Sequence, residues 1–207
     1  MTLETLNFWK AKAITYPIIA LSFLMLGCQS FKTTSELQSN FNEQELKDFQ
    51  TIRSFFIKNM MELNDENFNN EFRFKIKDLE ASGFSSVVPK KIEKLFTSIS
   101  ESTFNEIWEI KTQKRSNTQY GSYKYLAPKK NGKYQKFLSA ITPHNSMVRL
   151  YYDDLLKTEN FSHLSMSKYI NHNSLDFDLD NTNVQLLFAI HYITFYHDNN
   201  ITSNLLN

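Results

Sequence analysis

The stretch Thr182-Asn-Val-Gln-Leu-Leu-Phe-Ala-Ile-His-Tyr-Ile-Thr-Phe-Tyr196 decides the fold of this chain. Thr182 and Gln185 stand three residues apart, which is the spacing of a capping box at the start of a helix. From Val184 to Tyr196, apolar side chains lie on nearly every side of a helical wheel, and a helix of that kind must be buried all round. The sequence therefore predicts a central, buried helix that begins near Thr182 and ends near Asn199.

Amphipathic segments that need a buried partner surface precede this stretch. Asn42 with Glu45 and Thr103 with Glu106 predict two further capping boxes, and Pro89 suits the first turn of a helix. Between these signals, apolar residues recur at the helical spacings of three and four. The helices predicted in this way cover residues 42–63, 68–79, 89–99, 103–108, 134–141 and 148–155.

Other parts of the chain are less regular. Residues 72–76 also alternate as a strand does, but the helical spacing on both sides favours a helix there. Residues 113–132 contain turn signals, so we expect a long loop with a small hairpin around residues 120–126. Residues 160–179 are predicted to be irregular.

These patterns predict a mainly helical single domain over residues 42–207. The chain contains only four glycines, and a fold rich in tight turns usually needs more. The alternative is an α+β fold in which residues 104–153 form a four-stranded antiparallel meander.

The N-terminus has the parts of a secretory signal. Lys10 and Lys12 precede a 15-residue apolar stretch, Ala13 to Gly27, which is shorter than the ~20 residues that span a membrane. This stretch runs into Leu24-Met25-Leu26-Gly27-Cys28, which resembles the lipobox of bacterial lipoproteins. The resemblance covers the leader alone. It implies a signal peptide over residues 1–27, removed by signal peptidase, and acyl chains such as palmitate on Cys28.

The same resemblance implies a place in the cell. Two or three acyl chains hold a protein on a membrane essentially permanently, and residues 28–41 would be the lipidated cysteine and a polar tether. Gln29 stands where inner-membrane lipoproteins commonly have Asp, so we expect the bacterial outer membrane. Cys28 is the only cysteine, so no disulfide within the chain stabilises the domain.

The overall charge identifies no partner, because two of the 23 basic and one of the 22 acidic residues lie in the leader and the remainder is neutral. One segment, residues 111–136, is locally basic, with tyrosines between the lysines and no acid. Such a surface attracts an anionic envelope polymer, a phosphorylated glycolipid or an envelope protein; an exported protein would seldom meet nucleic acid. The candidate anion-binding residues are Lys114, Arg115, Lys124, Lys129, Lys130 and Lys133.

No motif identifies a reaction, a metal or a cofactor. We expect no metal and no cofactor, and the sequence leaves enzymatic activity open while favouring a protein that is not an enzyme. Asp176, Asp178 and Asp180 alternate as in a calcium loop, but Asn181 and Leu187 stand where that loop needs Gly and a bidentate Glu. His191 lies in the predicted central helix, either as a buried residue or as part of a site. We therefore expect a binding or interaction module; the alternatives are an envelope hydrolase with a site near His191 and an inhibitor or immunity-type protein.

The lipid anchor makes the first prediction. Replacing Cys28 by Ala removes the acylated thiol, so the variant should move from the membrane fraction to the soluble fraction when cells are fractionated. A Ser30→Ala variant should stay with the membranes. Continued tight membrane association of the Cys28→Ala protein would contradict the lipoprotein interpretation.

Overall fold

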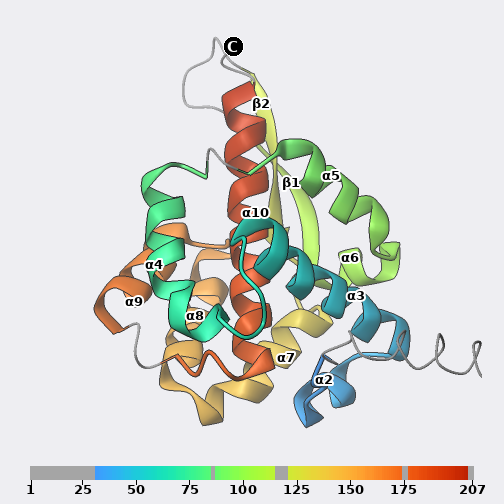
Figure 1. Cartoon of the computed structure of the whole chain (residues 1–207). Coiled ribbons are helices and arrows are strands. Elements are labelled where there is room, and N and C mark those ends of the chain that lie inside the picture. The colour runs from blue at the N-terminus through green and yellow to red at the C-terminus, as the bar shows by residue number, and fades with distance from the viewer. Residues whose placement is uncertain (1–30, 85–86, 115–120, 174–176, 205–207) are drawn as a thin grey trace, which may run out of the picture. The chain divides into compact units, whose positions relative to one another are not determined.

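Helix α10, Thr182–Asn204, lies at the centre of the domain in the computed structural model, and the other elements pack around it (Figure 1). The structure describes residues 31–84, 87–114, 121–173 and 177–204, and residues 32–207 form one compact unit. The elements before α10 are α2 Ser35–Asn40, α3 Glu43–Phe55, the π-helix η1 Phe56–Met60, α4 Phe68–Ala81, α5 Pro89–Ser98, α6 Glu101–Ile107, β1 Trp108–Lys114, β2 Ser122–Pro128, α7 Lys133–Ile141, the 3₁₀ helix η3 Thr142–His144, α8 Ser146–Thr158 and α9 His163–Asn173. None of the described helices is long and apolar enough to cross a bilayer.

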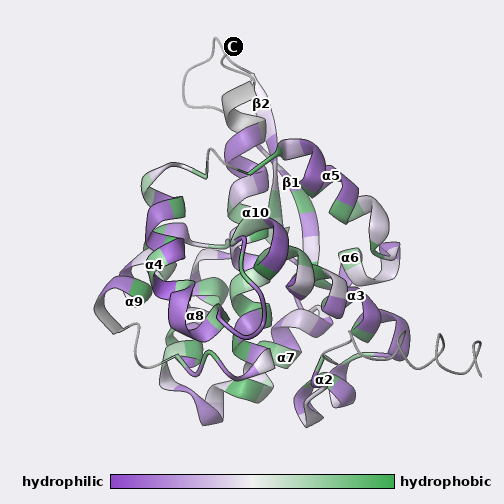
Figure 2. Ribbon diagram, in the orientation of Figure 1, coloured by the Kyte–Doolittle hydropathy of each residue, from purple (hydrophilic) through white to green (hydrophobic). Residues whose placement is uncertain are grey.

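The central helix is confirmed. Every side chain from Thr182 to Thr194 is buried, and the green hydrophobic colour of α10 is concentrated in the part inside the domain, while its upper end is hydrophilic (Figure 2). The predicted cap is wrong by one residue, because Asn181 accepts the amide hydrogen of Asn183 at 2.9 Å. Gln185 serves a different purpose, since its side chain donates to the Leu179 carbonyl at 2.6 Å and accepts from the guanidinium of Arg53.

Aromatic rings fill the space between α10 and its neighbours. Phe188 packs on Phe72 of α4 with ring centroids 4.7 Å apart, and Tyr192 stacks on Phe56 of η1 at 6.1 Å. Such pairs add about 0.5–1.5 kcal/mol each beyond the area that they bury. The chain has 18 Phe and 10 Tyr, so aromatic burial stabilises a domain in which no disulfide is possible.

The mainly helical fold is confirmed, and a two-stranded antiparallel hairpin is its only sheet among the described residues. β1 pairs with β2 from Trp108 opposite Pro128 to Lys114 opposite Ser122. The hairpin is therefore longer than the one expected around residues 120–126, and the alternative four-stranded meander is wrong because residues 133–158 are helical. Trp108, predicted at a helix end, begins β1, and its indole donates to Thr194 of α10 at 2.7 Å.

Two other segments differ from the prediction. Ser35–Asn40 of the expected tether form α2, whose Leu37 is 0% exposed, because Thr34 caps the helix and also donates to Asn183 of α10 at 2.7 Å. Residues 163–173 form α9 rather than an irregular segment. Its core contacts come mainly from Met166 and Ile170, and so few apolar residues in a polar segment give no clear periodic signal.

Most of the remaining helix signals are confirmed, and the cap of α6 is an exception. The capping box of α3 forms: the Glu45 amide donates to the Asn42 side chain at 3.0 Å, and the Asn42 amide donates to the Glu45 carboxylate at 2.8 Å. Pro89 is the first residue of α5, and residues 72–76 lie within α4. The α6 cap is one turn earlier than predicted, because Ser100 rather than Thr103 accepts the capping hydrogen bond.

His191 is a buried histidine in the middle of α10. It is 0% exposed, its Nδ1 lies 3.4 Å from the hydroxyl of Tyr151, and its Nε2 has no hydrogen-bond partner in the described part of the chain. Burial, and then the nearby ring of His163, lower its pKa to about 3. The imidazole is therefore neutral at physiological pH.

This burial predicts a loss of stability in acid. An unfolded histidine takes up a proton below a pH of about 6.5, whereas folded His191 stays neutral until the pH approaches 3. The free energy of unfolding should therefore fall between these two values, by up to about 1.4 kcal/mol per pH unit from this residue. Denaturant titrations at several pH values should show a shallower fall for His191→Phe than for the wild type. The exposed control His144→Gln should keep the wild-type slope; an unchanged slope in His191→Phe would contradict the prediction.

Candidate functional site

A groove lies between α3–η1 and α5. Its volume is about 630 Å³. Phe55 and Leu95 give it apolar contact area, and the ammonium-bearing side chains of Lys58, Lys91 and Lys94 line it from both sides. The other lining residues are polar: Gln50, Thr51, Ser54, Asn59 and Ser98.

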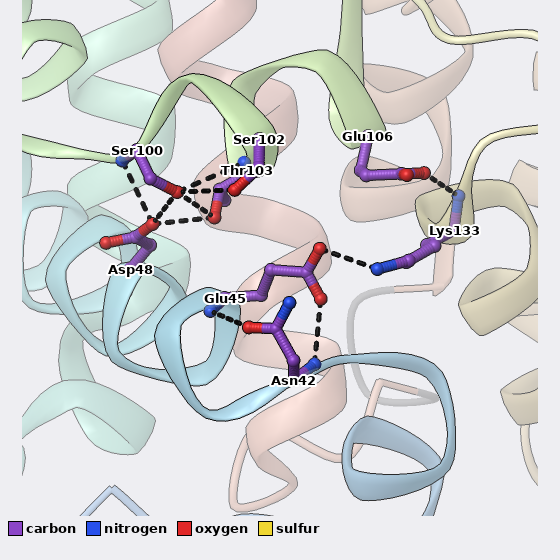
Figure 3. A network of polar contacts seen from close by, with 8 residues as sticks. All are labelled: Asn42, Glu45, Asp48, Ser100, Ser102, Thr103, Glu106 and Lys133. Carbon is purple, nitrogen blue, oxygen red and sulfur yellow. Dashed lines mark hydrogen bonds and ion pairs between the residues drawn. The ribbon is translucent and has the colours of Figure 1, made fainter.

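A carboxylate on α3 holds one end of this groove. Asp48 accepts hydrogen bonds from the Ser100 amide at 3.0 Å, the Ser100 hydroxyl at 2.6 Å and the Thr103 hydroxyl at 2.6 Å (Figure 3). Burial opposes ionisation of Asp48, but these hydrogen bonds outweigh it and leave its pKa below the ordinary value. Because Ser100 follows α5 by two residues, the ionised carboxylate fixes the end of α5 and the start of α6 against α3.

A second set of contacts extends the same network to α7 (Figure 3). Glu45, 1% exposed, accepts from the Lys133 ammonium at 2.7 Å, and Glu106 accepts from the Lys133 backbone amide at 2.9 Å. Gly132 precedes this amide, and a Cβ there would lie only 2.6 Å from the Glu106 carbonyl oxygen. The close approach of α6 and α7 therefore depends on glycine at this position.

The π-helix shapes the other end of the groove. A π turn accommodates one extra residue in a helix, and such turns are frequent at functional sites. In η1 the side chains of Phe56, Ile57 and Met60 are buried, whereas Lys58 and Asn59 are exposed and line the groove. The turn thus keeps its apolar residues in the core while it presents a lysine to the groove.

The charges of the groove are uncompensated. The ammonium groups of Lys58, Lys91 and Lys94 make no ion pair or hydrogen bond in the part of the chain that the structure describes. Helix α5 has no acid in its first turn, so Lys91 lies near the positive end of the helix dipole, where a cation is unfavourable by about 0.3–1 kcal/mol. An anion bound here would reduce both the repulsion among the lysines and the unfavourable interaction of Lys91 with the helix dipole.

Half of the basic residues predicted to form an anion-binding surface are paired with acids in the structure. Three of its lysines are paired with acids: Lys129 with Glu109 at 4.0 Å, Lys130 with Glu159 at 3.1 Å and Lys133 with Glu45 at 2.7 Å. Lys130, followed by Lys111, holds the pKa of Glu159 below its ordinary value.

The other members of that surface lie elsewhere. Lys114 and Lys124 are exposed on the hairpin without an ion pair among the described residues, and Arg115 lies outside the described residues. The six predicted cations therefore do not form one uncompensated surface.

Sequence reasoning missed the groove because its lysines are far apart in the chain. Lys58 is separated from Lys91 and Lys94 by α4, and only the fold brings α3–η1 beside α5. One signal was visible beforehand: Pro89 is followed by Lys90 and Lys91 with no acid, which is unusual for the first turn of a helix.

The other candidate chemistry has less structural support. His191 meets a hydroxyl, but it is buried and its low pKa makes it a poor base at neutral pH. The Asp178 carboxylate accepts from the Asp180 amide at 3.2 Å, and Asp176 lies outside the described residues. Within the described ranges no group of three or more histidine, cysteine or acidic side chains is placed to hold a metal ion.

Comparison with known proteins adds no functional assignment. The chain matches no family model, no curated protein and no solved structure.

The Asp48 network predicts a large effect on stability. Asp48→Ala removes charge-assisted hydrogen bonds, each worth about 1.5–3 kcal/mol, and leaves the Ser100 amide and Thr103 hydroxyl without their acceptor. The free energy of unfolding should fall by about 2–4 kcal/mol in denaturant titrations at pH 7. Because the folded pKa of Asp48 lies below 3.8, this contribution is complete above that pH and disappears as the pH falls through the folded pKa.

The control is Asp153→Ala on α8, an exposed carboxylate whose loss should change stability by no more than about 0.5 kcal/mol. Equal stability of the two variants would show that the Asp48 contacts do not hold α6 on α3.

Proposed function

We propose that this protein is a lipid-anchored binding module of the bacterial envelope, which holds anionic groups of an envelope polymer or glycolipid in the groove between α3–η1 and α5. One observation carries this proposal: Lys58, Lys91 and Lys94 line a groove of about 630 Å³ without an acid paired to any of them among the described residues. On the hairpin and the segment after it, Lys111, Lys129, Lys130 and Lys133 have carboxylate partners, whereas Lys114 and Lys124 have none among the described residues.

The size and lining of the groove support an extended anionic ligand. Its volume lies in the range typical of small-molecule sites, about 300–1,000 Å³. Ammonium groups on both sides attract phosphate or carboxylate groups, and the half-buried ring of Phe55 can contact sugar rings or acyl chains. Exposed ammonium groups are screened by salt, so binding at this site should weaken as ionic strength rises.

The proposed anchor supports the same role. Helix α2 begins directly after Thr34, and the six-residue step from Cys28 to Thr34 spans at most about 20 Å when fully extended. Acylation of Cys28 would therefore keep the domain within reach of the envelope surface. Phosphorylated glycolipids and anionic polymers occur at such a surface, and the lysine-lined groove is complementary to them in charge.

Charge reversal in the groove provides the test. Lys91→Glu/Lys94→Glu should weaken binding of lipopolysaccharide and of short-chain polyphosphate at least tenfold, and it should reduce the salt dependence of the remaining affinity. Binding is measured by titration calorimetry with the full-length, detergent-extracted protein.

The matched control is Lys114→Glu/Lys124→Glu on the hairpin, which makes the same change in net charge. This control should bind both probes with affinity close to that of the wild type. Equal losses in the two variants would assign binding to net charge, and no loss in the groove variant would overturn the proposal.

A further inference from the structure

The outer edge of strand β1 has backbone groups that no other strand uses. The Leu126 amide donates to the Asp198 carboxylate of α10 at 3.0 Å, so it points away from β1. In an antiparallel ladder, two directly opposite residues either both point their N–H and C=O groups toward each other or both point them outward, away from the partner strand. Ile110 is opposite Leu126, and Thr112 is two residues further along β1; both therefore point their N–H and C=O groups away from β2.

The two residues that carry these backbone groups lie at the surface. Ile110 is 62% exposed and Thr112 is exposed as well. Within the described ranges, neither residue has a hydrogen-bond partner beyond the hairpin. An extended segment can use such an edge by adding a strand, because main-chain hydrogen bonds supply affinity and alternate side chains supply selectivity.

The side chains beside this edge indicate the chemistry of the added segment. Opposite residues of an antiparallel pair share a face, so Ile110, Thr112 and Lys114 lie on the same face as Lys124, which pairs with Thr112. Lys114 and Lys124 are exposed and unpaired in the described structure. The small Thr112 side chain lets a long acidic side chain on an added strand reach across to Lys124.

We propose that the β1 edge binds an extended acidic peptide segment of another protein, which joins the hairpin as a third strand. The segment has an apolar residue beside Ile110 and acidic residues at the next two alternate positions, beside Thr112 and Lys114. A second copy of this chain fits less well, because edge-to-edge pairing would place two sets of Lys114 and Lys124 on one sheet face. This surface is separate from the lysine-lined groove and does not depend on the function proposed for it.

The test uses the full-length, detergent-extracted protein and two blocked heptapeptides, Thr-Val-Thr-Glu-Thr-Glu-Thr and its reverse sequence. At least one should bind, and binding should slow hydrogen exchange at the Ile110 and Thr112 amides. Versions with Lys in place of both Glu should bind at least tenfold more weakly.

Two variants separate backbone from charge recognition. Thr112→Pro removes an outward N–H without removing a hydrogen bond to β2, a position that an edge strand tolerates, and it should reduce peptide affinity at least tenfold. Lys114→Glu/Lys124→Glu should reverse the preference in favour of the lysine peptides while the fold is kept.

Three outcomes would overturn the proposal: no binding of either acidic peptide, binding that leaves exchange at Ile110 and Thr112 unchanged, or unchanged selectivity in the charge-reversed variant. Concentration-dependent self-association blocked by Thr112→Pro would assign the edge to a second copy of the chain instead. Loss of peptide binding with intact lipopolysaccharide binding would separate this edge from the groove.

Discussion

Helix α10 has no polar face to leave in water, so the other elements have to surround it. Its buried length from Thr182 to Thr194 is covered by α3, η1, α5 and the hairpin, and aromatic rings fill the spaces between them. Some polar groups inside this core have hydrogen-bond partners, whereas the Nε2 atom of His191 has none among the described residues. The Trp108 indole bonds to Thr194, and the Tyr192 hydroxyl donates to Glu80 at 2.7 Å. The arrangement of the outer helices therefore follows from the need to cover one apolar cylinder.

Two acids of α3 hold neighbouring helices together and do not pair with a lysine of the groove. Asp48 and Glu45 both lie on α3, and they bind the start of α6 and Lys133 of α7. This leaves one side of α3 rich in structural hydrogen bonds and the other side facing uncompensated cations. A domain with almost no net charge can thus present a strongly local positive potential.

Several elements could be predicted from the sequence because their signals are local. The all-round apolar pattern of α10, the capping box at Asn42 and the position of Pro89 each depend on residues within a few turns. The incorrect predictions concern elements whose bounds depend on contacts between residues far apart in the chain. Ser100 caps α6 because Asp48, 52 residues away, also binds it, and α2 is held by Asn183, 149 residues from Thr34.

The candidate site was harder to predict for the same reason. A sequence shows where lysines gather, but it does not show which of them meet a carboxylate in the fold. Lys133 is far from Glu45 in the chain and 2.7 Å from it in space, whereas Lys58 and Lys94 meet no acid among the described residues. Local charge density therefore favoured the hairpin, where half of the predicted cations are paired with acids, and gave no sign of the three lysines that line the groove.

The hydrogen bond between Thr34 and Asn183 has a mechanical consequence. Thr34 caps α2 and also bonds to the first turn of α10. This contact therefore joins the first described helix to the last one. A pulling force applied through the residues before Thr34 would load the central helix directly, before it strained any loop. Tension on the N-terminus would then act on the whole core as one unit, and resistance to extraction from a surface would depend on the cohesion of α10 with its neighbours.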